Sequence, residues 1–132
     1  MIFTNSDGGS RGNPGEGAIG VLVRNNDSII EMYSEKIGVV TNNIAEYKAL
    51  IKALEIASKH TKDELTCVLD SELVVKQLFG EYKVKNEKLL PLFLKVQKLQ
   101  DNFRKIKYVH VSRWNKFQQI ADNLLNMELD GR

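Results

Sequence analysis

The first fifteen residues, MIFTNSDGGSRGNPG, place a carboxylate between a β-prone segment and a glycine-rich stretch. We expect a strand that delivers Asp7 into a loop, with Asn13-Pro14 forming a turn. Carboxylate oxygens beside exposed backbone N–H groups suit a metal ion together with a phosphate or a sugar. An Asp-Gly hairpin turn is the simpler alternative. The other carboxylates of the chain favour the first interpretation.

Strand-like and helix-like segments alternate along the rest of the chain. The segments after the glycine stretch are expected as strands at 17–23 and 28–37, a helix at 43–59, a buried strand at 65–69, a helix at 71–79, a helix at 87–103, a strand at 105–111 and a helix at 119–129. The first three strands would form an antiparallel meander. A strand that follows a helix returns by a right-handed crossover, so residues 65–69 should pair in parallel. We expect one α/β domain covering residues 1–132.

The chain has 42% hydrophobic and 27% charged residues, which is typical of a globular protein. It lacks a signal-like opening and an apolar run of membrane-spanning length, so we expect a cytoplasmic protein. The lone cysteine, Cys67, lies in the strand at 65–69, where a buried structural thiol is expected.

Basic charge is concentrated in one segment of the chain. Residues 81–116 carry 10 Lys and Arg against 3 Asp and Glu, whereas residues 1–80 carry 8 against 11. The basic segment also holds the aromatic residues Tyr82, Phe93, Phe103, Tyr108 and Trp114. This combination favours a surface for a polyanion. A solvated amphipathic helix is the alternative, and charge alone does not separate the two.

Four carboxylates lie where secondary-structure elements are expected to converge. Asp7 ends the first strand, Glu46 lies on the apolar stripe of a helix, Asp70 follows a buried strand, and Asp122 lies in the first turn of the last helix. Each has a simpler explanation as a helix cap or as a partner of a helix dipole. Clustered carboxylates repel one another unless divalent cations lie between them, and oxygen ligands favour Mg²⁺ or Mn²⁺. Two such ions can support phosphodiester cleavage.

Four sequence blocks resemble the type 1 ribonucleases H, of the compact archaeal-like and bacterial kind. They are DGGSRGNPG from Asp7, TNNIAEYKAL from Thr41, LDS from Leu69, and IADNL from Ile120. The resemblance implies a ribonuclease H-like fold with a five-stranded mixed sheet flanked by helices. It further implies hydrolysis of the RNA strand of RNA–DNA hybrids, leaving 3′-hydroxyl and 5′-phosphate ends. By the same resemblance, Asp7, Glu46, Asp70 and Asp122 are the ligands of two Mg²⁺ ions, for which Mn²⁺ could substitute.

The resemblance also places the contacts with the substrate. The residues implied to read ribose 2′-hydroxyls are Gly8, Gly9, Ser10, Arg11, Gly12, Asn13, Asn42, Asn43 and Glu46. The 2′-hydroxyl is what distinguishes RNA from DNA. Thr41 would contact DNA phosphates. Since residues 80–86 are too short for the basic handle helix of some relatives, Lys83, Lys85 and Lys88 are expected to bind the duplex instead.

Several questions stay open at the level of the sequence. Ser112 stands where some relatives carry a histidine, and His110 is out of register with it. Residues 113–118 do not follow the family's spacing of Arg and Asn before Ala121-Asp122, so a role of Arg113 or Trp114 in substrate contact stays open. A non-catalytic binding module, a DNA resolvase or integrase core, and a phosphatase are the rival functions. We expect the RNA–DNA hybrid as partner, double-stranded RNA as an open second one, no membrane partner, and a monomer.

Overall fold

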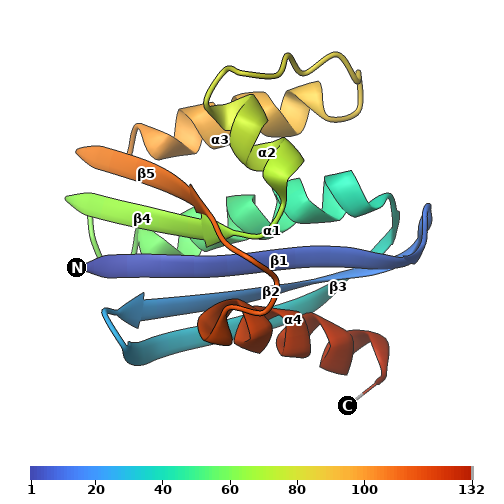
Figure 1. Cartoon of the computed structure of the whole chain (residues 1–132), viewed down its shortest axis with the longest axis horizontal. Helices are drawn as coiled ribbons and strands as arrows, with labels where there is room; N and C mark the ends of the chain where they lie inside the picture. The colour runs from blue at the N-terminus through green and yellow to red at the C-terminus, as the bar shows by residue number, and fades with distance from the viewer. Residues whose placement is uncertain (132) are drawn as a thin grey trace.

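The computed structural model describes residues 1–131. Its elements in chain order are β1 (Ile2–Gly12), β2 (Gly15–Asn25), β3 (Ser28–Val40), α1 (Asn42–Ala57), β4 (Glu64–Leu69), α2 (Glu72–Leu78), α3 (Leu90–Gln100), β5 (Lys105–His110) and α4 (Lys116–Leu129). The strands form one sheet in the order β3-β2-β1-β4-β5 (Figure 1). β1, β2 and β3 pair antiparallel, whereas β4 pairs in parallel with both β1 and β5. The predicted α/β fold with a five-stranded mixed sheet is confirmed.

Helices cover both faces of this sheet (Figure 1). Successive strand residues point to opposite faces. Gly8 lies against Ala45 of α1, whereas Gly20, the cross-strand partner of Asp7, lies against Ala121 of α4. Helix α1 therefore covers one face and α4 the other. Helices α2 and α3 share the main apolar cluster with α1, which places them on the α1 side. Among residues 1–131, no helix combines the length and apolar character needed to cross a membrane.

Helix α1 can lie close to the sheet because the helix residues that face the sheet are small. Its alanines at four-residue spacing, Ala45, Ala49, Ala53 and Ala57, are all fully buried. The predicted apolar stripe is thus confirmed. Asn42 and Asn43 are favourable N-cap residues, but neither caps this helix. Thr41 is the N-cap, with an extended backbone and a hydroxyl that accepts a hydrogen bond from Ile44 N at 3.3 Å.

The expected glycine-rich loop after Asp7 is also wrong. β1 continues to Gly12 and pairs residue by residue with β2, from Ile2 opposite Asn25 to Gly12 opposite Gly15. The turn is confined to Asn13-Pro14. The physical reason is that a long antiparallel ladder satisfies backbone groups that a loop would leave to solvent. Asp7 consequently lies in mid-strand, and the Asp-Gly pair forms no turn.

Other boundaries differ by one to three residues, and three differences affect interpretation. Helix α3 begins at Leu90, three residues after the predicted start, and the Leu90 side chain is exposed. Strand β5 ends at His110. Helix α4 begins at Lys116, because Asn115 accepts hydrogen bonds from Phe117 N and Gln118 N and caps it. Asp122 therefore lies in the second turn of α4, not the first. Cys67 is buried, as predicted.

Candidate active site

A notch forms in the sheet where β4 ends before β1 does. The parallel pairing of these strands stops at Asn5 and Val68, and β4 itself ends at Leu69. Over residues 6–12 of β1, no described strand pairs with the edge opposite β2. Helices α1 and α4 contact β1 from opposite faces. Ligand sites of open α/β sheets lie at such carboxyl ends of parallel strands.

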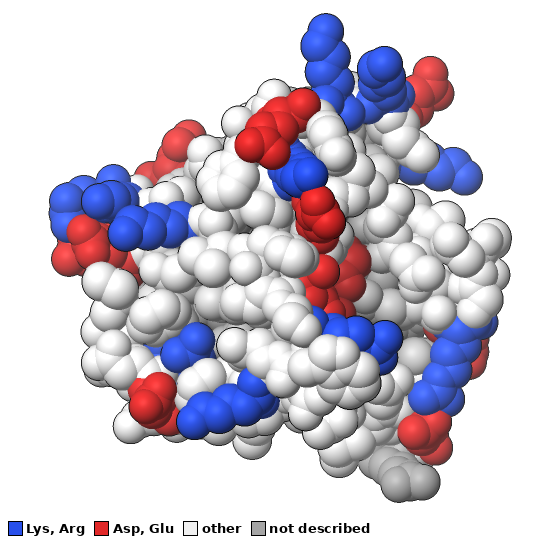
Figure 2. Space-filling model, viewed as in Figure 1, with Lys and Arg blue, Asp and Glu red and all other residues white. Residues whose placement is uncertain are grey.

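Three carboxylates meet in this notch. Asp7 of β1, Glu46 of α1 and Asp70 after β4 each offer an oxygen, and these oxygens lie within 4.8 Å of one another. Asp7 and Glu46 are buried, with 6% and 9% of their surface exposed, and Asp70 is half-buried. Figure 2 shows acidic side chains gathered at the middle of this face of the molecule.

Asp122, the fourth candidate, reaches the cluster from the second turn of α4. It lies outside the 4.8 Å group formed by the other three. Its side chain is half-buried, and it is close enough to raise the pKa values of Asp7, Glu46 and Asp70. The structure therefore brings all four predicted carboxylates to one end of the sheet.

Glu46 is fixed to β1 through one of its two oxygens. Gly8 N donates a hydrogen bond to Oε1 at 3.1 Å, on the edge of β1 that β4 leaves open. Oε2 is buried and has no hydrogen-bond partner among the described residues. A cap role for Glu46 is excluded, because Thr41 caps α1. A buried, unpartnered carboxylate oxygen is costly unless a cation meets it.

Gly8 permits the contact that holds Glu46 in place. A Cβ at this position would lie 2.1 Å from the backbone oxygen of Ala45 in α1. Gly20 has the same relation to α4, since its Cβ would lie 2.1 Å from the backbone oxygen of Ala121. Two glycines thus let two helices press against opposite faces of the sheet beside Asp7.

Burial and mutual repulsion both perturb the titration of the cluster. Burial is the largest cause of the raised pKa of Asp7, followed by the negative charge of Glu46. Burial likewise raises the pKa of Glu46 and of Asp70. A proton or a bound cation would offset this burial of negative charge. An all-oxygen donor set with an unpartnered oxygen fits a hard divalent ion such as Mg²⁺ or Mn²⁺.

Gln118 orients Asp70, and sequence reasoning did not find this role. It is fully buried in the first turn of α4, and its Nε2 donates to Ser6 O at 2.8 Å and to Asp70 Oδ1 at 3.3 Å. Its Oε1 accepts a hydrogen bond from Asn5 Nδ2 at 3.2 Å. Asn5 Oδ1 in turn accepts from Arg24 Nε at 2.9 Å. The available signal was Asn5, a polar residue within an apolar strand, but the start of α4 was placed too late to include Gln118.

Asp70 is free to serve the cluster because its neighbour caps α2. Ser71 Oγ accepts a hydrogen bond from Val74 N at 3.3 Å, so Ser71 is the N-cap. The cap role considered for Asp70 is therefore excluded.

The residues implied to read ribose lie at the tip of the β1–β2 hairpin and at the start of α1. Asn42 Oδ1 accepts a hydrogen bond from Ser10 N at 2.9 Å, and Asn42 N donates to Asn13 Oδ1 at 3.0 Å. These bonds join the two segments into one surface. Within it, Gly9 is half-buried and Gly12 and Asn43 are exposed. The Arg11 guanidinium forms an ion pair with Asp130 at 2.5 Å, and the Gly8 amide already donates to Glu46.

The three lysines expected to bind the duplex lie on the connection between α2 and α3. Lys83, Lys85 and Lys88 are exposed. This connection forms one extremity of the molecule, where basic side chains project into solvent (Figures 1 and 2).

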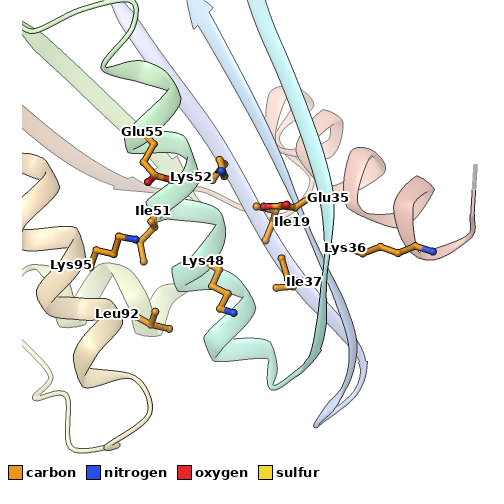
Figure 3. Close-up of a pocket in the computed structure, with 10 residues that line it drawn as sticks. All are labelled: Ile19, Glu35, Lys36, Ile37, Lys48, Ile51, Lys52, Glu55, Leu92 and Lys95. Atoms are coloured by element: carbon orange, nitrogen blue, oxygen red, sulfur yellow. Dashed lines mark ion pairs between the residues drawn. The ribbon is translucent and has the colours of Figure 1, made fainter.

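A separate depression of about 460 Å³ lies between β3, α1 and α3 (Figure 3). Its lining includes Lys48 and Lys52 of α1 and Lys95 of α3. None of the four carboxylates lines it. It therefore offers a basic surface without the groups needed for the chemistry of the notch.

The sheet order and the carboxylate-lined notch define a ribonuclease H-like domain. A family model described as reverse transcriptase-like matches residues 5–128. The chain is 40% identical to ribonuclease HI of Halobacterium salinarum, over 94% of this chain and 62% of that protein. It is also 40% identical to the bifunctional protein Rv2228c of Mycobacterium tuberculosis, over 98% of this chain and 35% of that protein. The chain thus spans about a third of the length of the mycobacterial relative.

Two solved structures extend this relationship to the whole fold. The crystal structure of RNase H1 from Halobacterium salinarum superposes with a TM-score of 0.93 at 36% identity, covering 99% of this chain and 98% of that one. LC11-RNase H1, crystallised with an RNA/DNA hybrid, superposes with a TM-score of 0.92 at 36% identity, with the same coverage. The chain belongs to the type 1 ribonuclease H family.

Proposed function

We propose that this protein is a metal-dependent endoribonuclease that hydrolyses the RNA strand of RNA–DNA hybrids. The observation that carries the proposal is the meeting of Asp7, Glu46 and Asp70 in the notch beside β4. The RNA/DNA hybrid bound by the related LC11-RNase H1 supports the substrate class.

Asp7, Glu46 and Asp70, with Asp122 beside them, are the residues that would hold the metal. The unpartnered Oε2 of Glu46 and the raised pKa values of the buried carboxylates support a cation there. Two Mg²⁺ ions bound there would supply activation of a water and stabilisation of the departing 3′-oxygen, and the products would carry 3′-hydroxyl and 5′-phosphate ends. Mn²⁺ shares the preference for oxygen ligands and could substitute.

The contribution of the chain is to hold these carboxylates in fixed positions. Gly8 N orients Glu46 from β1, and Gln118 orients Asp70 from α4. Asp7 is rigid because both of its neighbours belong to the β1–β2 ladder. A site held by strands and packed helices keeps its geometry better than one built on loops.

Recognition of the hybrid would divide between two surfaces. The hairpin tip and the start of α1, from Gly9 to Asn13 with Asn42 and Asn43, would contact ribose 2′-hydroxyls. Thr41 and the exposed lysines Lys83, Lys85 and Lys88 would contact phosphates of the DNA strand.

The test is cleavage of a hybrid labelled on each strand, with Mg²⁺, with Mn²⁺ and with chelator. Single-stranded RNA, double-stranded RNA and duplex DNA serve as comparison substrates. We expect metal-dependent cleavage of the RNA strand of the hybrid, with 3′-hydroxyl products. Tight binding without cleavage in either metal would instead indicate a non-catalytic binding module, and cleavage of duplex DNA would indicate a different nuclease.

A further inference from the structure

Trp114 is a large aromatic side chain that the fold leaves uncovered. It is the only tryptophan of the chain, and 70% of its surface is exposed. The guanidinium of Arg113 lies 5.0 Å from the centre of its ring. A guanidinium over an indole ring adds positive charge to this exposed aromatic surface.

The loop that carries Trp114 is tied at both ends to the site. Val111 N donates a hydrogen bond to Leu69 O at 2.9 Å, immediately before Asp70. At the other end Gln118 donates to Asp70 Oδ1. Trp114 lies between these two attachments. In Figure 1 the connection from β5 to α4 crosses the face of the sheet beside the end of β4. The loop that carries Trp114 therefore begins and ends beside Asp70.

The loop is also held internally, so that its side chains are presented on a fixed backbone. Trp114 N donates to Ser112 Oγ at 3.1 Å, and Asn115 N donates to Ser112 O at 3.0 Å. Asn115 then caps α4. A backbone ordered before binding loses little entropy when a ligand docks on it.

The chemistry of this pair matches a nucleotide whose base is unpaired. Both faces of a base inside a duplex are covered by its neighbours, so an indole can stack only on a base outside the paired region. The positive charges of Arg113 and Lys116 suit the phosphates of such a nucleotide. The strand that would enter the adjacent carboxylate site is the RNA strand.

We infer that Arg113 and Trp114 form a stacking platform for an unpaired nucleotide of the RNA strand beside the cleavage site. This inference rests on the proposed function and adds a substrate preference to it. Hybrids with a single-stranded RNA extension should bind more tightly than blunt hybrids of the same paired length.

The test uses the Asp7→Asn variant, so that binding is measured without cleavage. Fluorescence anisotropy compares three kinds of hybrid with the same paired region: blunt, with an unpaired RNA extension, and with an unpaired DNA extension. The RNA extension is placed at each end of the RNA strand in turn. We expect the RNA extension to tighten binding by about tenfold, the effect of one stacked base. The emission of Trp114 should also change more with this hybrid than with the blunt one.

Two further variants assign the effect to the platform. Adding Trp114→Ala should make the blunt and RNA-extended hybrids bind equally, whereas Trp114→Phe should retain part of the preference. Phe79→Ala is the matched control, because Phe79 is 60% exposed but lies at the end of α2, outside the loop. It should leave the preference unchanged.

Equal affinity for blunt and RNA-extended hybrids would overturn the inference. Tighter binding of only the DNA-extended hybrid would also overturn it, as would a preference for the RNA extension that remains in the Trp114→Ala variant. Cleavage of the blunt hybrid by the unmodified protein is measured separately. If that protein cleaves while the extension has no effect, only the platform is refuted. If it cleaves nothing, the proposed function fails, whatever the extension does.

Discussion

Replacing Gly8 with alanine tests whether the close approach of α1 to β1 builds the site. The added Cβ would lie 2.1 Å from the Ala45 oxygen and 2.7 Å from the Glu46 nitrogen. Strand and helix would have to separate by about 1 Å before these atoms reached tolerable contact. The separation would move Glu46 away from β1 and break the 3.1 Å hydrogen bond from Gly8 N to Glu46 Oε1.

We expect Gly8→Ala to lower the free energy of unfolding by about 1–3 kcal/mol, the usual cost of overpacking. Loss of a hydrogen bond that orients a metal ligand should weaken Mg²⁺ binding by about 10–100-fold. A displacement of this size should reduce cleavage by about 100-fold. Urea denaturation, calorimetric metal titration and single-turnover cleavage measure the three effects.

Gly9→Ala is the matched control for folding and metal binding. Its Cβ would meet only Leu125 Cδ1, at an ordinary 3.6 Å. The free energy of unfolding should change by less than about 0.5 kcal/mol, with metal affinity unchanged. If Gly8→Ala resembled Gly9→Ala in both measurements, the argument that the glycine positions Glu46 would be refuted.

Three further perturbations test the rest of the site. Asp7→Asn should abolish cleavage. Without metal, the unmodified protein should lose stability as the pH rises from about 5 to about 8, and Asp7→Asn should lose less. In this pH range Asp7 keeps its proton in the folded state, because its pKa is raised there, but has lost it in the unfolded state. Each rise in pH therefore favours the unfolded state. Gln118→Leu should weaken Mg²⁺ binding by about tenfold, because Asp70 loses its donor. Reversing Lys83, Lys85 and Lys88 to glutamate should weaken hybrid binding and reduce its dependence on salt concentration.

The glutamine and lysine substitutions each have a matched control within the chain. Gln77→Leu removes a buried glutamine whose Oε1 accepts a hydrogen bond from Tyr47 OH at 2.5 Å and not from any of the four carboxylates. It should lower stability without changing metal affinity. Reversing Lys48 and Lys95 changes the charge of the depression between α1 and α3, and hybrid binding should keep its salt slope. A salt slope that responded to these two lysines instead would place the duplex on that face. Stability of metal-free protein that rose between the two pH values would contradict the raised pKa of Asp7.

The elements that could be predicted are those whose pattern is local. The alanine stripe of α1 and the apolar run of β4 have the period and length of a buried helix and a buried strand, and both lie close to the predicted positions. The four carboxylates were also found by local reasoning, because a charged residue on an apolar stripe or after a buried strand needs a partner. Their roles as ligands came from resemblance to a family, not from spacing.

Features that depend on distant partners could not be predicted in this way. The stretch after Asp7 has the composition of a loop, yet it is strand because β2 supplies the partner for every residue up to Gly12. Gln118 looks like an ordinary helix residue, and its role exists only because α4 meets Ser6 and Asp70 from other parts of the chain. Sequence alone determined which groups are available and which segments are helix or strand, because propensity and hydrophobic period act over a few residues. Only the tertiary structure decided that β4 stops short of β1 and that two glycines admit two helices, because those contacts join residues far apart in the chain.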